Sequence, residues 1–229
     1  MKIIKPYAEI LTPLDALRES ILRHIELCGR VCYKSEGRIT DGSYVPFVKA
    51  IVARGHESVL EHTSATVRFV CDRGVSHEIV RHRLASYSQE STRYCNYGKD
   101  DFGCEITVIE PEFLMDDTTG YAIWKQAMAD AELAYFSLLE WGCTPEEARA
   151  VLPNALKTEL IMTANMREWR YFFRLRCAPA AHPPTRCRSF SGTSMRNCGS
   201  PIFGRCERTR LYRHGNTFSI EVVYIWQDW

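Results

Sequence analysis

One segment of the chain concentrates side chains that bind anions. Residues 81–94 read Arg-His-Arg-Leu-Ala-Ser-Tyr-Ser-Gln-Glu-Ser-Thr-Arg-Tyr, which places three arginines, one histidine and three serines in fourteen positions. Arginine offers a rigid fork of donors to phosphate or carboxylate, serine adds short donors, and tyrosine stacks on a planar ring. The pattern predicts a site for an anionic ligand that carries a ring, which is to say a nucleotide.

A charged helix followed by a polar turn would use many of the same residues, and the full spacing favours the site over this alternative. We expect a helix that begins at Ser76, its N-cap, and carries His77, Glu78 and Arg81. By themselves, Glu78 and Arg81 would form an ion pair three residues apart. On a helix Arg81 and Arg83 would lie about 200° apart, so they would serve two ligands or a site between subunits.

Composition limits the other classes of function. The 229 residues can bury one substantial core, and 29 basic against 28 acidic residues argue against a protein that coats nucleic acid. No apolar run is long enough to cross a bilayer, and residues 1–6 lack the apolar stretch of a secretory signal. These features predict a cytoplasmic protein with no membrane partner. The ten cysteines contain no Cys-x-x-Cys pair, and we interpret most of them as small buried hydrophobic residues.

Helices and strands are expected to alternate irregularly. Hydrophobic periodicity predicts helices over about residues 15–33, 46–54 and 121–141, and a further helix that starts at Pro145. In the third helix, Ala127, Ala131, Ala134, Tyr135 and Leu138 form the expected buried stripe. Strands are expected over residues 64–70 and 105–109. We therefore predict an α/β (α+β) protein in which one catalytic domain, residues 1–183, has a mixed central sheet and long helices.

Four motifs occur in order. The segment 81–94 contains Arg-His-Arg, then seven residues, then Ser-x-Arg, and it is preceded by His56-Glu57-Ser58-Val59-Leu60-Glu61-His62. Further along come Arg149-x-x-Leu-Pro, and then Thr163-x-Asn-x-Arg with Arg174-Leu-Arg176 a few residues beyond. Taken alone, His56 and His62 beside two carboxylates could suggest a metal site, but no cysteine or third histidine is placed to complete the shell. We predict no metal.

Together these motifs resemble the signature of the flavin-dependent thymidylate synthases over about residues 1–183. The resemblance implies an enzyme that methylates dUMP to dTMP, with 5,10-methylenetetrahydrofolate as carbon donor and NADPH as reductant through FAD. It also implies a homotetramer whose active sites are shared between subunits. In such a scheme the cofactor supplies the redox chemistry and the protein supplies binding, orientation and electrostatics.

The resemblance also assigns site residues. Arg176 is the catalytic residue, which binds the uracil ring and favours its ionisation at N3. The flavin-binding residues it implies are Ser58, Glu61, Arg81, His82, Arg83, Gln89, Asn165, Arg167 and Tyr171. The nucleotide-binding residues it implies are Glu78, Arg81, Gln89, Glu90, Ser91, Arg93, Arg149 and Arg176.

The chain departs from the family at two places. Tyr171 stands where these enzymes commonly carry His or Asn. After Pro183 the helical periodicity of the family ends, and residues 186–229 contain seven arginines, no lysine and three acidic residues. The segment 184–229 is thus an atypical tail, for which a zinc module, an added strand pair at residues 217–226 and a reading-frame change are three explanations. We favour the last, which predicts a poorly ordered tail.

Three alternatives compete with the active enzyme: a nucleotide-binding homologue with lost activity, a nucleic-acid-binding protein, and a nucleotide-binding regulatory module. A nucleotide-binding homologue, whose activity is lost because of the altered tail, would keep the phosphate arginines. A nucleic-acid-binding protein would use Arg81, Arg83 and Arg93 on phosphates, with an affinity that falls steeply as salt rises. A flavin absorbance band in the purified protein would exclude a regulatory module that needs no flavin.

Overall fold

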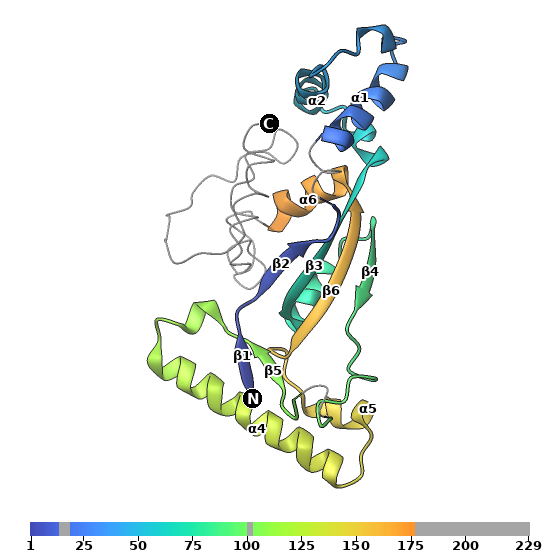
Figure 1. Cartoon of the computed structure of the whole chain (residues 1–229). Helices are drawn as coiled ribbons and strands as arrows, with labels where there is room; N and C mark the ends of the chain where they lie inside the picture. Colours follow the sequence, from blue (N-terminus) through green and yellow to red (C-terminus); the bar gives the residue numbers. More distant parts are fainter. Residues whose placement is uncertain (14–18, 100–102, 177–229) are drawn as a thin grey trace. The chain divides into compact units, whose positions relative to one another are not determined.

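The computed structural model describes residues 1–13, 19–99 and 103–176 (Figure 1). The predicted tail lies outside the described residues. Strands β2 (Tyr7–Ile10), β3 (Ser64–Asp72), β6 (Lys157–Asn165) and β4 (Ala85–Gln89) form a four-stranded sheet in that order. Strands β1 (Lys2–Ile4) and β5 (Thr107–Ile109) form a parallel pair. The α+β class predicted from the sequence is therefore confirmed.

The described residues form two compact units. Unit 1 comprises Met1–Tyr7, Phe69–Arg81 and Tyr87–Ile161, and unit 2 comprises Ala8–Arg68, His82–Ser86 and the described residues from Met162 onward. Strands β3, β4 and β6 each contribute residues to both units.

The core of unit 1 lies between the β1–β5 pair and the long helix α4 (Thr118–Glu140), which runs along that pair in Figure 1. Asp117 caps α4 by accepting the N–H of Gly120. Met128 and Tyr135, two turns apart on the helix, are its buried residues. The helix was predicted, but the predicted stripe was wrong at Ala127, which is exposed because the buried face passes through Met128 instead.

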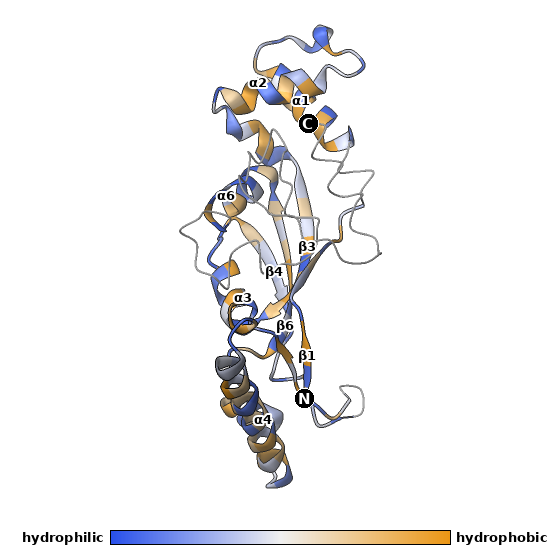
Figure 2. Ribbon diagram, turned by 90° about the vertical axis from the view of Figure 1, so that its left-hand side faces the viewer, coloured by the Kyte–Doolittle hydropathy of each residue, from blue (hydrophilic) through white to orange (hydrophobic). Residues whose placement is uncertain are grey.

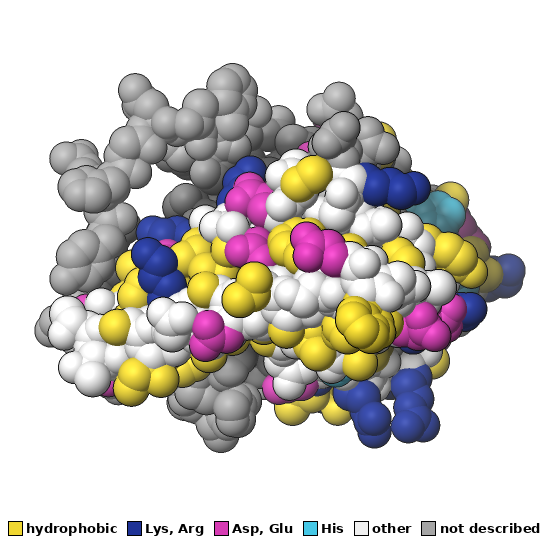
Figure 3. Space-filling view, turned by 90° about the horizontal axis from the view of Figure 1, so that it is seen from below, with side chains coloured by type: hydrophobic (Ala, Val, Ile, Leu, Met, Phe, Trp, Pro, Cys, Tyr) yellow, Lys and Arg dark blue, Asp and Glu magenta, His cyan; other side chains and the backbone are white. Residues whose placement is uncertain are grey.

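Part of α4 remains apolar on its outside. Ile123 and Leu133 are each 67% exposed, and Trp141 at its C-terminal cap is 87% exposed. The view from below shows hydrophobic side chains spread over this face among scattered charged ones (Figure 3).

Helix α3 (Arg73–Ile79) corrects the predicted helix start. Its N-cap is Asp72, whose carboxylate accepts the N–H of Val75 at 2.7 Å, whereas Ser76 lies inside the helix and donates to the carbonyl of Arg73. The helix ends before Arg81, so the argument that placed Arg81 and Arg83 on opposite faces of a helix was wrong. The chain turns there and enters β4 instead.

In unit 2, helices α1 (Ile21–Val31) and α2 (Tyr44–Ala53) pack closely. A Cβ atom on Gly29 would lie 2.7 Å from the ring of Phe47, so a larger residue there would force this ring to move. The buried carboxylate of Glu26 binds Arg30 and accepts the hydroxyl of Ser43. Both helices combine hydrophobic and hydrophilic stretches (Figure 2), as their predicted periodicity requires. Of the predicted helix over residues 15–33, residues 15–18 lie outside the described residues, and α1 itself begins at Ile21.

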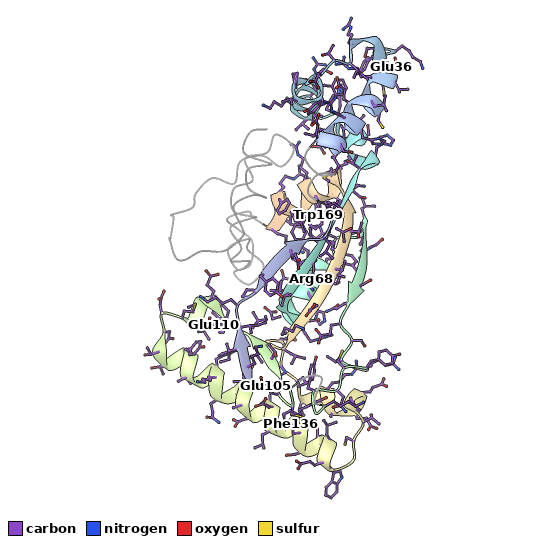
Figure 4. All side chains as sticks on the ribbon, viewed as in Figure 1. Glu36, Arg68, Glu105, Glu110, Phe136 and Trp169 are labelled. Carbon is purple, nitrogen blue, oxygen red and sulfur yellow. The ribbon has the colours of Figure 1, made fainter. Side chains whose placement is uncertain are left out.

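Helix α6 (Met166–Arg176) packs against β3 in the same unit. The buried Trp169 donates its indole N–H to the carbonyl of Ala65 at 3.0 Å, and Figure 4 labels this side chain together with Arg68 on β3. This contact anchors the helix that carries several of the predicted site residues.

Two short helices complete the described elements that matter for the site. The 3-10 helix η3 (Glu57–His62) contains the histidine-flanked motif, and α5 (Pro145–Ala148) begins at the predicted proline with a capping box between Thr144 and Glu147. No helix within residues 1–13, 19–99 and 103–176 is long and apolar enough to cross a membrane.

Candidate active site

The predicted site residues divide between the two units. Apart from Arg176, the residues predicted to bind the nucleotide belong to unit 1. Apart from Arg81 and Gln89, the residues predicted to bind the flavin belong to unit 2.

In unit 1, two of the predicted phosphate-binding arginines meet at one glutamate. Arg93 Nε lies 2.9 Å from the carboxylate of Glu146, and Arg149 donates its Nε–H to the backbone carbonyl of Glu146 at 3.1 Å. Arg149 also donates to the hydroxyl of Thr92 at 3.3 Å. The capping box of α5 fixes this short helix, so two cations 56 positions apart in sequence are held together beside hydroxyl donors. Such a cluster suits an anion.

The neighbouring Ser91 closes a local turn. Its hydroxyl accepts the backbone N–H of Arg93 at 3.3 Å, so it lies next to the arginine cluster.

Gln89 and Glu90, at the end of β4, are tied to β6. The Gln89 amide donates to the hydroxyls of Ser76 and Thr158, and Lys157 binds the Glu90 carboxylate at 2.9 Å. Burial lowers the pKa of Lys157, but its hydrogen bonds to Glu159 and Glu90 outweigh burial and raise the pKa overall. The Lys157 ammonium group is therefore charged at neutral pH and ties the end of β4 to β6.

The other predicted nucleotide residues are less enclosed. Glu78 lies half-buried on α3, while the side chain of Arg81 is exposed in the turn that follows. The backbone N–H of Arg81 donates to the carbonyl of Glu78 at 3.2 Å.

Unit 2 contains a cavity of about 300 Å³. Its lining comes from η3, the end of β6, Leu84 and α6: Glu57, Glu61, Leu84, Asn165, Arg167, Glu168, Arg170, Tyr171 and Arg174. Four predicted flavin residues, Glu61, Asn165, Arg167 and Tyr171, are thus brought to one cavity. Ser58 and Arg83 are exposed in the same unit but do not line it, and the buried His82 lies beside Tyr171 with ring centroids 5.6 Å apart.

Local contacts explain how α6 presents these side chains. Asn165 accepts the backbone N–H of Glu168 at 2.8 Å and so caps the helix. At the second position of the helix, Arg167 binds the carboxylates of Glu61 and Glu57. These ion pairs fix a guanidinium at the cavity wall.

Arg176 is the last residue of α6. Its Nε–H donates to Nε2 of His82 at 3.1 Å, which fixes one edge of the guanidinium. The predicted catalytic arginine is thereby held by a residue of the Arg-His-Arg motif.

The cavity suits part of the flavin predicted from the sequence. Nη1 of Arg170 is buried without a hydrogen-bond partner among the described residues, and Arg170 and Arg174 line the wall with Arg167. An anionic group, such as the diphosphate of a dinucleotide, would satisfy such a donor. Five lining residues were not predicted from the sequence: Glu57, Leu84, Glu168, Arg170 and Arg174. For the arginines, the available signal was the helical spacing of Arg167, Arg170 and Arg174, three and four residues apart.

No group of three or more His, Cys, Asp or Glu side chains in the part of the chain described here is arranged to hold a metal ion. Of the six described cysteines, Cys71 alone is buried, so interpreting most cysteines as buried was wrong.

Comparison with protein families identifies one match. Residues 17–187 match the model of the thymidylate synthase complementing protein family, Thy1. The flavin-dependent thymidylate synthase of Pyrococcus furiosus is 36% identical over 170 residues, which cover 74% of this chain and 68% of the relative. The enzyme of that name from Geobacter sulfurreducens is 37% identical over 164 residues, which cover 69% of each chain.

Solved structures agree in fold. A UMP/dUMP methylase from Streptomyces cacaoi, PolB, solved with 5-Br dUMP, superimposes with a TM-score of 0.67 at 22% sequence identity. The match covers 83% of this chain and 87% of the other. At this level of identity the likeness concerns the fold alone.

Proposed function

The chain belongs to the flavin-dependent thymidylate synthase family, since the family model spans residues 17–187, and we propose that it methylates dUMP to dTMP. The family resemblance predicted from the motifs is confirmed. The chain is accordingly an enzyme of the flavin-dependent methyltransferase class.

The arginine cluster of unit 1 is the observation that carries the choice of substrate. Arg93 and Arg149 come from separate motifs, and the fold brings both to Glu146 beside Thr92. Two guanidinium groups next to hydroxyl donors suit the phosphate of a nucleoside monophosphate better than a neutral nucleoside. We assign this cluster, with Ser91, to the dUMP phosphate.

Arg176 is assigned to the uracil ring. A fixed cation beside a ring nitrogen stabilises the anion formed when that nitrogen loses its proton, which makes the neighbouring carbon a better nucleophile. The Nε–H bond to His82 fixes the orientation of the guanidinium. The arginine therefore acts as a preorganised charge.

FAD is the cofactor in this proposal. When bound, it would supply the redox chemistry, with NADPH as the reductant and methylenetetrahydrofolate as the carbon donor. The residues of unit 2 that would hold it are those at the cavity, with the arginines 167, 170 and 174 supplying positive charge. Their role is to bind and orient the cofactor.

The assembly proposed is a homotetramer with shared sites, in the cytoplasm. The exposed Ile123 and Leu133 on α4 are apolar side chains that an association surface could cover. The assignment of single flavin and nucleotide residues to neighbouring subunits also forms part of this proposal.

Anaerobic turnover tests the function directly. The purified protein, with FAD, NADPH and methylenetetrahydrofolate, is expected to convert dUMP to dTMP, measured by chromatography, and to stop when any one of them is left out. Replacing Arg176 by Ala should leave FAD bound and reduce turnover by a factor on the order of 10² or more.

The control is Arg38→Ala, which removes an exposed arginine of the 3-10 helix Glu36–Arg38 and should keep full turnover. A protein that binds dUMP and FAD but forms no dTMP would instead be the nucleotide-binding homologue with lost activity. Near-normal turnover of Arg176→Ala would overturn the role given to this arginine.

A further inference from the structure

Three side chains of unit 2, Glu168, His82 and Arg176, form a hydrogen-bonded chain. His82 Nδ1 lies 2.8 Å from Oε1 of Glu168, and His82 Nε2 lies 3.1 Å from Nε of Arg176. His82 is 3% and Glu168 6% exposed, so water does not compete for the bond between them. Glu168 belonged to no predicted set.

The geometry fixes where the protons are. The Nε of an arginine can only donate, so Nε2 of His82 must accept with its lone pair. The imidazole is then neutral and carries its proton on Nδ1, which donates to the Glu168 carboxylate. The rings of Phe172 and Tyr171, with centroids 4.8 Å and 5.6 Å from that of His82, hold the imidazole between them.

Helix geometry explains why a third residue is needed. Glu168 and Arg176 are eight residues apart on α6, which corresponds to a rise of about 12 Å. The carboxylate cannot reach the guanidinium over that distance, and the imidazole of His82 spans the gap. Glu168 is fixed in turn, because its backbone N–H donates to the side chain of Asn165, the N-cap of α6.

We propose that Glu168 and His82 are positioning residues that orient the guanidinium of Arg176 toward the substrate. The proposal rests on the proposed function, in which Arg176 acts on the uracil ring. Glu168 keeps the imidazole of His82 in the tautomer protonated at Nδ1, and Nε2 of His82 fixes the orientation of the Arg176 guanidinium. Neither residue needs to touch the substrate for this role.

Electrostatics agree with a neutral imidazole. Burial lowers the pKa of His82, the nearby Arg176 charge lowers it further, and the carboxylate of Glu168 opposes both. The titratable or charged groups of α6 that face the ring are Glu168, Arg176 and Tyr171. A proton added to Nε2 would set an N–H against the Nε–H of Arg176 and break the contact.

Nitrogen NMR of the full-length protein, labelled with ¹⁵N histidine and saturated with FAD, tests the proton placement without any turnover. The signal of His82 is identified by its loss in His82→Gln, and we expect the pattern of a neutral imidazole protonated at Nδ1. A proton on Nε2, or a charged imidazole at neutral pH, would overturn the relay.

Kinetics of two variants test the positioning role. In FAD-saturated protein, Glu168→Gln should lower kcat/KM for dUMP by about tenfold or more. The acid limb of its pH profile should move to lower pH, because the carboxylate that raises the His82 pKa is gone. His82→Gln retains an acceptor for Arg176 and cannot titrate, so the acid limb assigned to His82 should be absent.

Matched controls are Glu140→Gln at the exposed end of α4 and His24→Gln on the exposed side of α1, both expected to show the wild-type profile. An unchanged acid limb in both His82→Gln and Glu168→Gln would refute the positioning role. A wild-type protein with the expected tautomer but no dTMP formation would refute the proposed function instead.

Discussion

Arg149 offers the sharpest test of where the nucleotide phosphate binds. Its Nε and Nη1 donate to the Glu146 carbonyl and to Thr92, so the guanidinium is fixed before any ligand arrives. The side chain remains 37% exposed, and its ion pair with the Glu146 carboxylate is long, at 4.0 Å. Removing it should therefore affect ligand binding far more than folding.

The expected magnitude follows from the loss of one charge-assisted contact. Such contacts contribute about 1.5–3 kcal/mol, so Arg149→Ala should weaken dUMP binding about 10- to 150-fold. Arg149→Lys keeps the positive charge but loses the planar fork of donors, so it should weaken dUMP binding less than Arg149→Ala does, by roughly fivefold. Isothermal titration calorimetry on FAD-saturated protein measures both values.

Flavin affinity is the internal reference for this measurement. FAD binding should be unchanged in Arg149→Ala, since Arg149 belongs to unit 1 and the cavity residues to unit 2. The Arg38→Ala control should bind both ligands as the wild type does. Unaltered dUMP affinity in a folded Arg149→Ala protein, or an equal loss of both ligands, would refute the assignment.

Three further predictions concern stability. Trp169→Phe deletes the indole donor to Ala65 and should lower the free energy of unfolding by about 1–3 kcal/mol, whereas Trp141→Phe, at an exposed position, should change it by less than about 0.5 kcal/mol; urea denaturation compares them. The pKa of His82 is lowered in the folded state, so as pH falls the unfolded chain takes up this proton before the folded chain does. The wild type should therefore lose stability relative to His82→Gln as pH falls below 6.5. An equal dependence of the unfolding free energy on pH in the two proteins would contradict this. Lys157→Met should cost roughly 1–3 kcal/mol at neutral pH, and the difference should shrink as pH rises above 10.5 through the raised pKa of Lys157; a difference independent of pH would exclude the ion pair as its cause.

The sequence predicted the elements that have one clear buried face. Helices α1, α2 and α4 and strand β3 follow the expected periodicity, although their ends differ by several residues. The buried residues of strand β6, Thr158, Leu160, Met162 and Ala164, alternate regularly. The strand was missed because the apolar Ile161, at an outward and partly exposed position, interrupts the apolar–polar alternation of the sequence. Strand β4 was missed because its small polar residues suggested a ligand site and not a sheet.

For the site, sequence motifs identified residues but not their partners. Glu168 and His82 are 86 positions apart, and no local pattern links them; folding alone brings them together. Two errors concern helix caps. Asp72 outcompetes Ser76 because it accepts the N–H three residues ahead, and Asn165-x-x-Glu168 carries a capping signal that the motif match concealed. The assignment of individual residues to flavin or nucleotide remains a prediction.

The cap of α6 has a consequence for how position 165 can vary. Serine, threonine and aspartate cap helices about as well as asparagine, so the fold by itself would let this position drift among them. A ligand that needs the amide would restrict it to asparagine. Variants of Asn165 that survive a selection for folded protein but not a selection for thymidylate synthesis therefore measure how much of the constraint comes from the ligand.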